Sequence, residues 1–454
     1  MAKVYRLPSL FDLYNFNWKQ LNGTGDLERL KMVFEVLQDE ELMLKLEAER
    51  KGRRDDYPIR PVWNSIIAGI VFQHKSIESL RRELLRNGEL RMVCGFELLN
   101  GADAVPSKDA YSLMSKKLLN HQDDIDSMFD KIVEEIRQVL PDFGKNTAVD
   151  SKAIRSECNG KNKRNDKDNR GDADADWGKK VYHGKREDGT LWEKITSWFG
   201  YKVHLLVDTT YELPISYEVT KASVPDIKQL MPLVEKAKNT HPSLQIEILT
   251  GDKGYDSKEE IVKLWDNHKI KPVIDIRNMW KDKEETHALK SDKVDNIAYN
   301  YKGCVYCYDM NTAEKKELAF NGFEKDRDSL KYLCPAKAYG MECKGKELCG
   351  EKGYGRIVRI PLETDRRIFT PIARSSYKWE KAYKSRTAVE RVNSRIDGSF
   401  MFEHHYIRGQ AKMKMRMGMA LLVMVCMALA RIRMNQKEMM RSLVKRPLPK
   451  EKAA

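Results

Sequence analysis

Apolar residues recur every three or four positions through the first part of the chain, which predicts a mostly helical segment over residues 1–140. The spacing is clear between Leu27 and Leu37 and again between Ile66 and Val71. Basic side chains alternate with leucines from Ser76 to Lys116. We assign residues 1–140 to a helical N-terminal DNA-binding domain, in which two interpretations stay open: a helix-turn-helix that reads DNA, and a plain helical bundle with a solvated basic face.

The pattern changes after Asn146 to short apolar runs of the kind that form strands. The predicted strands cover residues 147–150, 199–207, 213–220, 245–250 and 272–276, with helices after 224 and after 255. The second and third of these strands are close enough to form a hairpin. The polar residues 156–190 hold too little apolar surface to fold alone and are predicted to form a surface loop. Residues 141–277 therefore read as the first part of a mixed α/β domain.

Residues 278–355 interrupt this domain with charges, turns and five of the eight cysteines. Order returns at Tyr377, where a helix is predicted to run to Ile396 and to end at Gly398. Residues 356–430 complete the α/β domain, and 431–454 form a basic tail. The longest apolar run, Met417 to Ala430, is too short to cross a bilayer, so we interpret the methionine-rich helix over residues 413–430 as buried or partner-facing and expect no membrane partner.

Charge narrows the class of partner. The 454 residues carry 82 Lys and Arg against 68 Asp and Glu, a formal net charge of +14. An excess of this size favours a polyanionic partner such as nucleic acid. The first residues lack the apolar run of a signal peptide, so we expect a cytoplasmic protein with reduced cysteines.

Three acidic residues stand out by context. Asp150 and Asp252 each end a short predicted strand, and ligands of open α/β sheets bind at the carboxyl ends of strands. Glu390 lies on the helix predicted over 377–396, on one face with Tyr383 and Arg386. Converging carboxylates require a cation, and oxygen ligands suit Mg²⁺ or Mn²⁺, two of which would support phosphoryl transfer. Strand-ending aspartates are also ordinary turn residues, and the residues alone leave that alternative open.

Four motifs resemble the DDE transposases of bacterial insertion sequences. They are Val149-Asp150-Ser151, the run from Gly200 to Asp208, the run from Thr250 to Asp256, and Tyr383-x2-Arg386-x3-Glu390. The resemblance covers residues 50–430 and is greatest to the branch with a Tyr-Arg-Glu-Lys signature. It implies an α/β, RNase H-like mixed sheet with flanking helices, preceded by the helical domain and interrupted by the Cys-rich insertion.

The resemblance also implies roles for residues. Asp150, Asp252 and Glu390 match the catalytic triad that holds Mg²⁺. The fourth signature position departs from the pattern, because Asp397 stands where Lys is expected and Arg395 is the substitute we consider. The residues expected to contact DNA are Tyr383, Arg386, Arg395, Lys202, His204 and Lys253. For the last three, an ordinary strand or turn role stays open.

The activity that this family membership would bring is binding of terminal inverted repeats, cleavage of the DNA and transfer of its 3′-hydroxyl ends into target DNA. Two ends must be held together, so a homodimeric synaptic complex is expected, with the methionine-rich helix and the basic tail as candidate surfaces. Two alternatives remain from the sequence: a DNA-binding derivative without catalysis, and an RNase H-like nuclease that does not transpose.

The insertion carries a separate candidate metal site. Its cysteines are Cys304, Cys307, Cys334, Cys343 and Cys349. A Cys-x2-Cys knuckle in a reducing compartment is typical of structural zinc, with two later cysteines completing a tetrahedral site. Free thiols and an iron–sulfur cluster stay open. A metal here would help fold an insertion that the sequence indicates to be poor in core residues.

Overall fold

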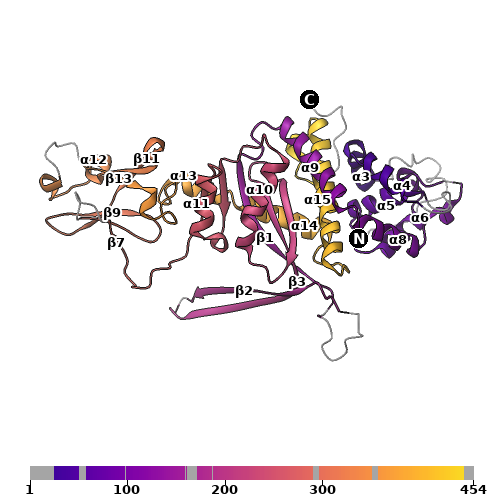
Figure 1. Cartoon of the computed structure of the whole chain (residues 1–454), viewed down its shortest axis with the longest axis horizontal. Coiled ribbons are helices and arrows are strands. Elements are labelled where there is room, and N and C mark those ends of the chain that lie inside the picture. Colours follow the sequence, from indigo (N-terminus) through magenta and orange to yellow (C-terminus); the bar gives the residue numbers. More distant parts are fainter. Residues whose placement is uncertain are drawn as a thin grey trace, which may run out of the picture. The chain divides into compact units, whose positions relative to one another are not determined.

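A computed structural model describes residues 25–50, 58–97, 99–158, 160, 171–186, 188–289, 296–349 and 356–443. The chain divides into two compact units (Figure 1). The helical unit comprises Met1–Glu135, Arg395–Ile407 and Ala411–Ala454, and the sheet unit comprises Ile136–Ser394 and Arg408–Gln410. Most of the predicted basic tail, residues 444–454, lies outside the described residues.

The helical unit confirms the prediction of a mostly helical N-terminal region. Its helices are α3 (Gly25–Val36), α4 (Glu40–Ala48), α5 (Ile59–Val71), α6 (Ile77–Arg86), α7 (Gly88–Cys94), α8 (Lys108–Leu119) and α9 (Gln122–Val139). Side-chain caps fix several helix starts: Ser107, for example, accepts the amide of Ala110 at 3.2 Å before α8. Nearly every residue of α5 is buried, so the other short helices pack around it.

Helix α15 (Gln410–Arg433) contains the methionine-rich run and is the one described helix long and apolar enough to cross a membrane. The most apolar stretch of this helix is 94% buried within the protein, as expected for a core helix. Met413, Met417 and Met424 have no exposed surface. The interpretation as a buried helix is confirmed, whereas its use as a dimer surface is wrong, because the chain itself already covers it.

The sheet unit is built on a six-stranded mixed sheet with the order β2, β3, β1, β5, β6, and β4 paired to β3. The strands are β1 (Asn146–Arg155), β2 (Asp176–Lys185), β3 (Leu191–Asp208), β4 (Pro214–Lys221), β5 (Ile248–Gly251) and β6 (Lys271–Ile274). Pairs among β1 to β4 are antiparallel, while β1–β5 and β5–β6 are parallel. Helices α10 (Leu230–Thr240) and α11 (Lys258–Asp266) connect the later strands. This is the mixed α/β sheet with flanking helices that the sequence predicted.

One strand arises where the sequence predicted only a loop. β2 pairs with the first half of the long strand β3, and the two form a ribbon that extends beyond the sheet (Figure 1). Two tryptophans stabilise it by lying over glycines of the opposite strand, Trp198 over Gly178 and Trp192 over Gly184. The polar composition of residues 156–190 concealed these cross-strand pairs. Residues 159, 161–170 and 187 of that segment lie outside the described part.

The helix predicted over residues 377–396 is two helices, α13 (Tyr377–Lys384) and α14 (Thr387–Phe400). Between them, the amides of Arg386 and Ala388 bond to carbonyls three residues back, to Tyr383 and Ser385, which tightens the turn. The Ser385 hydroxyl donates to the carbonyl of Ala382 at 2.6 Å and satisfies a carbonyl at the end of α13. Gly398 does not end the second helix, which continues to Phe400.

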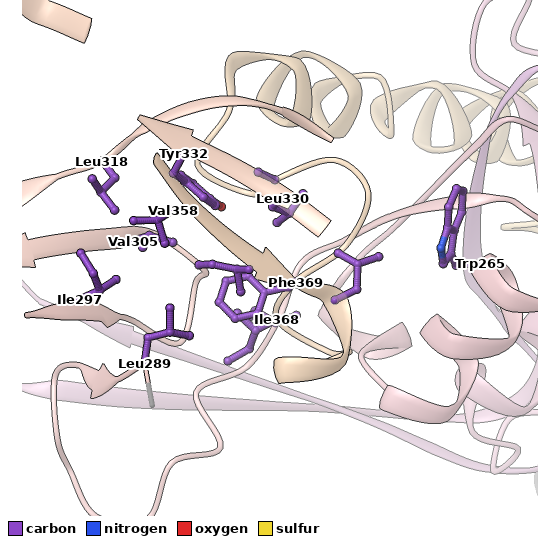
Figure 2. Close-up of a cluster of buried hydrophobic side chains, with 14 residues drawn as sticks. Trp265, Leu289, Ile297, Val305, Leu318, Leu330, Tyr332, Val358, Ile368 and Phe369 are labelled. Carbon is purple, nitrogen blue, oxygen red and sulfur yellow. The ribbon is translucent and has the colours of Figure 1, made fainter. Parts of the chain in front are cut away.

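The insertion has a hydrophobic core of its own, contrary to the expectation from its composition. One sheet has the order β10 (Lys315–Glu317), β9 (Val305–Tyr308), β8 (Ile297–Tyr299), β7 (His287–Ala288), and the other the order β11 (Ala319–Glu324), β12 (Ser329–Leu333), β13 (Ile357–Pro361). A short helix, α12 (Pro335–Tyr339), follows β12. Figure 2 shows Val305, Leu330 and Phe369 among the buried side chains of this cluster. Because β13 pairs with β12, the insertion reaches beyond the predicted limit at 355.

Candidate active site

Asp150 and Asp252 lie together on adjacent parallel strands. Ala148 and Thr250 form the last pair between β1 and β5. Asp150 lies two residues after Ala148, and Asp252 lies two residues after Thr250. Neighbouring strands lie about 4.8 Å apart, so the two carboxylates start from backbones at the same level. Burial raises the pKa of Asp150 to about 6, and the nearby Asp252 carboxylate adds to the rise. The structure therefore brings these two predicted residues into electrostatic contact.

The sequence predicted Asp150 at the end of a strand, but in the structure it lies in the middle of β1. β1 continues to Arg155, paired throughout with β3, and what ends at Ala148 is its pairing with β5. At Asp150, therefore, β1 is still paired with β3 on one edge and is no longer paired with β5 on the other. The pairing with β3 holds the backbone of Asp150, and the amide of Ser151 donates to its Oδ1 at 2.8 Å.

The turn after β5 holds the Asp252 carboxylate. The amide of Gly254 donates to Asp252 Oδ1 at 2.7 Å, and a Cβ added at Gly254 would lie 2.8 Å from that oxygen. Arg367 anchors the end of the same turn with two bonds of 2.9 Å to Asp256. A side chain at position 254 would therefore displace the Asp252 carboxylate from this position.

Glu390 is in the first turn of α14, and its carboxylate accepts a 2.6 Å hydrogen bond from Arg386. The Glu390 side chain is 50% exposed, and that of Arg386 is 20% exposed. Arg386 also lies close enough to Asp150 to oppose the rise of its pKa. The guanidinium therefore links the third acid to the aspartate pair.

An aromatic column supports Arg386 from behind. Its guanidinium lies 5.9 Å from the centre of the Tyr383 ring, and Tyr383 stacks on Trp379 with ring centres 4.8 Å apart. The half-buried Arg374 lies 5.8 Å from the centre of the Trp379 ring. Tyr383 and Arg386 thus act as neighbours, although they are not on one continuous helix. Sequence reasoning missed Trp379, whose spacing of four residues before Tyr383 on a helix was the available signal.

The donor set suits a hard divalent cation. Within the described ranges, no group of three or more His, Cys, Asp or Glu side chains is arranged closely enough to hold a metal ion as it stands. Asp150 and Asp252 nevertheless repel each other, as the raised pKa of Asp150 records, and a cation relieves that repulsion. Carboxylate oxygens are the ligands that Mg²⁺ and Mn²⁺ prefer. The two aspartates fit such an ion, with Glu390 held nearby by Arg386.

Two residues predicted to contact DNA are buried instead. Lys202 is 8% exposed and donates to Asp226 at 2.8 Å and to the carbonyl of Val224 at 2.9 Å. His204 has no exposed surface, and its Nε2 lies 2.8 Å from the hydroxyl of Thr220. The prediction that they face DNA is wrong, because both side chains complete hydrogen bonds inside the protein.

The remaining predicted contacts differ in position. The Lys253 side chain is 60% exposed beside Asp252, with its Nζ 3.4 Å from Asp275. Arg395 is half-buried on α14 and, five residues after Glu390, points about 140° away from it around the helix. Asp397, at the position where the signature has Lys, returns to the face of Glu390. Helix geometry therefore gives Arg395 little support as the substitute for the missing lysine.

Sequence reasoning also missed Lys180 of β2. It lies close enough to Asp150 to oppose the rise of that residue's pKa. No sequence signal pointed to it, because its strand was predicted to be a loop. The cation is brought to the aspartates only by the pairing of β2 with β3.

Comparison with known proteins gives one family. Residues 143–426 match the family model described as "Transposase DDE domain". No curated protein matches the chain. Among solved structures, the piggyBac transposase synaptic complex with hairpin DNA is similar at 11% sequence identity and a TM-score of 0.33, over 94% of this chain and 87% of that chain.

Proposed function

This chain belongs to the transposase DDE-domain family, and on that premise we propose that it cuts DNA at the terminal inverted repeats of an insertion sequence and joins the freed 3′ ends to target DNA. The observation that carries the proposal is the pair of aspartates on parallel strands β1 and β5, with Glu390 tied to the pair by Arg386. We propose that the protein acts in the cytoplasm on DNA and assembles there as a homodimer on two ends.

The proposed chemistry uses Asp150, Asp252 and Glu390 as ligands of Mg²⁺ or Mn²⁺. Two such ions, held by these residues, would supply activation of a water or a 3′-hydroxyl and stabilisation of the leaving oxygen in an in-line displacement. Asp150 offers an ionised carboxylate at neutral pH, above its pKa of about 6. Gly254 keeps the Asp252 carboxylate oriented through its amide. Arg386 carries a positive charge beside the acids, where it neutralises or grips a phosphate.

Around the acids, Lys180 and the exposed Lys253 supply further positive charge for the DNA backbone. Such contacts position the duplex without reading its sequence. The helical unit is the proposed reader of the inverted repeats, since the sheet unit is committed to chemistry. Each neutralised phosphate makes DNA binding weaker as salt rises, so end binding should fall steeply with ionic strength.

The test is cleavage of a supercoiled donor plasmid that carries the element's ends, with purified protein and Mg²⁺. Asp252→Asn should abolish cutting, because it removes a ligand charge while keeping the size of the side chain, and should leave end binding in a mobility-shift assay unchanged. Glu259→Gln, which alters an exposed acid on α11, is the matched control and should cut normally. Equal cutting by Asp252→Asn would overturn the assignment.

The same assay separates the alternatives. Hydrolysis of the donor without any joined product would favour a nuclease that does not transpose. End binding with no cutting by the wild-type chain in Mg²⁺ or Mn²⁺ would favour a DNA-binding derivative without catalysis.

A further inference from the structure

Four of the insertion's five cysteines line one small cavity. Its volume is about 30 Å³, room for one or two water-sized groups, and Ile297 and Leu318 of the hydrophobic cluster form part of its wall. We call it the four-cysteine cavity. Its cysteines are Cys307 on β9, Cys334 immediately before α12, Cys343 in the following loop and Cys349 in a short 3₁₀ turn.

The fifth cysteine is excluded, although it belongs to the Cys-x2-Cys motif. Cys304 immediately precedes β9, and residues three apart on a strand point to opposite faces. Its amide donates to Asn300 Oδ1 at 3.0 Å, and Cys304 is not among the residues that line the cavity. The motif therefore does not form a zinc knuckle here, and the cysteines that converge are far apart in the sequence.

Asp309 fixes the loop that brings Cys343 to the cavity. Its Oδ2 accepts the amide of Lys344 at 2.9 Å and the thiol of Cys343 at 3.3 Å, while Oδ1 accepts the amide of Asn311 at 2.9 Å. A Cβ added at Gly345 would lie 2.9 Å from Oδ1, so the loop packs closely on the carboxylate. Hydrogen bonds to Asp309, which directly follows β9, thus hold this segment near Cys307.

A buried cation completes the wall. Lys316 on β10 is directly paired with Cys307, is 7% exposed and lies 4.0 Å from Asp309. Four thiolates around a divalent ion carry a net charge of −2, which a nearby ammonium stabilises. Lys316 also pairs with Glu314 at 3.3 Å, so its charge is shared with two carboxylates. The cavity therefore has the ligands of a tetrathiolate site beside an ion-paired lysine.

We propose that the four-cysteine cavity binds one Zn²⁺, which joins β9, the start of α12 and the 343–349 segment and closes the exposed side of the insertion's core. Tetrahedral Cys₄ coordination is typical of structural zinc. On binding, each thiol loses its proton to solvent as its sulfur bonds the metal. Among the described residues the four cysteines line the cavity but are not yet close enough together to form a metal site. Binding therefore draws them together.

The first test is the metal content of the purified full-length protein. About one zinc per chain is expected, without the visible absorbance of an iron–sulfur cluster. Cobalt in place of zinc should give the intense thiolate-to-metal charge-transfer bands of a Cys₄ site, and X-ray absorption should place four sulfurs at about 2.3 Å from zinc. Absence of bound metal, or a disulfide between any two of the four cysteines, would overturn the proposal.

Paired variants identify the ligands. Cys307→Ser should lower the bound zinc at least tenfold, whereas Cys304→Ser, in the same motif, should retain it. Equal loss in both would contradict the four-cysteine assignment. If Cys307→Ser does not fold, thiol labelling of the wild-type chain decides: a chelator should expose four additional cysteines to a thiol reagent, and peptide mapping should identify them as those lining the cavity. Both readouts are independent of DNA cleavage, so they stand or fall separately from the proposed function.

Discussion

Arg386 donates a hydrogen bond of 2.6 Å to Glu390 from the turn between α13 and α14. The sequence did not predict that the helix is interrupted before α14. The hydrogen bond holds the Glu390 carboxylate through a charged residue only four positions earlier in the chain. Since the same guanidinium also acts on Asp150, removing it should disturb the whole group of acids.

Arg386→Gln should lower the rate of donor cleavage about 10- to 100-fold, because a hydrogen bond to a charged group is worth about 1.5–3 kcal/mol. Arg391→Gln is the control on the same helix, since Arg391 binds Glu212 at 2.8 Å instead. Cleavage kinetics at saturating Mg²⁺ measure both variants. A normal rate for Arg386→Gln, at unchanged melting temperature, would contradict a role at the acids.

The aspartate pair should make the stability of the metal-free protein depend on pH. The pKa of Asp150 is about 6 in the folded chain and about 3.9 when unfolded, so the folded state binds more protons between these values. The free energy of unfolding therefore decreases as pH rises through this window, by at most about 3 kcal/mol, and then levels off.

Asp150→Asn should remove this pH-dependent decrease in the free energy of unfolding. In urea unfolding with a chelator present, its stability relative to the wild type should increase from pH 4.5 to pH 7.5. A difference that stays constant over this range would show that Asp150 titrates normally. Added Mg²⁺ should stabilise the wild type more than the variant, since binding to the folded state alone raises stability.

Gly254→Ala should impair cutting through Asp252 without unfolding the protein. The new Cβ would stand 2.8 Å from Asp252 Oδ1, so the carboxylate must rotate away from its amide partner. We expect at least a tenfold loss of cleavage rate, with end binding and circular dichroism unchanged. Full activity in this variant would mean that the orientation of Asp252 is not fixed by this turn.

Gly398→Ala should stabilise the protein by about 0.5–1 kcal/mol. Gly398 lies inside α14, where an added Cβ meets nothing within 4 Å, and alanine forms helix more readily than glycine. Had Gly398 ended the helix in a left-handed conformation, the substitution would instead be costly. Thermal unfolding of the two proteins distinguishes these outcomes by the sign of the change.

Lys202→Met should lower stability and leave DNA affinity unaltered. The substitution leaves the Asp226 carboxylate without the ammonium that donates to it at 2.8 Å, which we expect to cost about 1–3 kcal/mol. Denaturant unfolding and a DNA-binding titration of the folded variant measure the two effects. A weaker DNA complex at full stability would restore the original interpretation of Lys202 as a DNA contact.

Local patterns were sufficient for many elements. The helical N-terminal region, the hairpin of β3 and β4 and the buried helix α15 all follow from short-range periodicity and turn chemistry. The predictions were wrong where the structure depends on contacts between residues distant in the sequence. The ribbon of β2 depends on tryptophans lying over glycines of the opposite strand, and the insertion's core is assembled from strands as far apart as β8 and β13.

By itself the sequence determined the mixed α/β class, most strands of the central sheet and the three acids whose motifs resemble a transposase, because strand periodicity and motif spacing are local properties. Only the tertiary structure decided which side chains act together. It buried the side chains of Lys202 and His204, and it placed Cys307, but not Cys304, in the lining of the four-cysteine cavity. It also linked Glu390 to the aspartates through Arg386. The reason is that burial, strand register and the position of a charge depend on residues far along the chain, which no local pattern encodes.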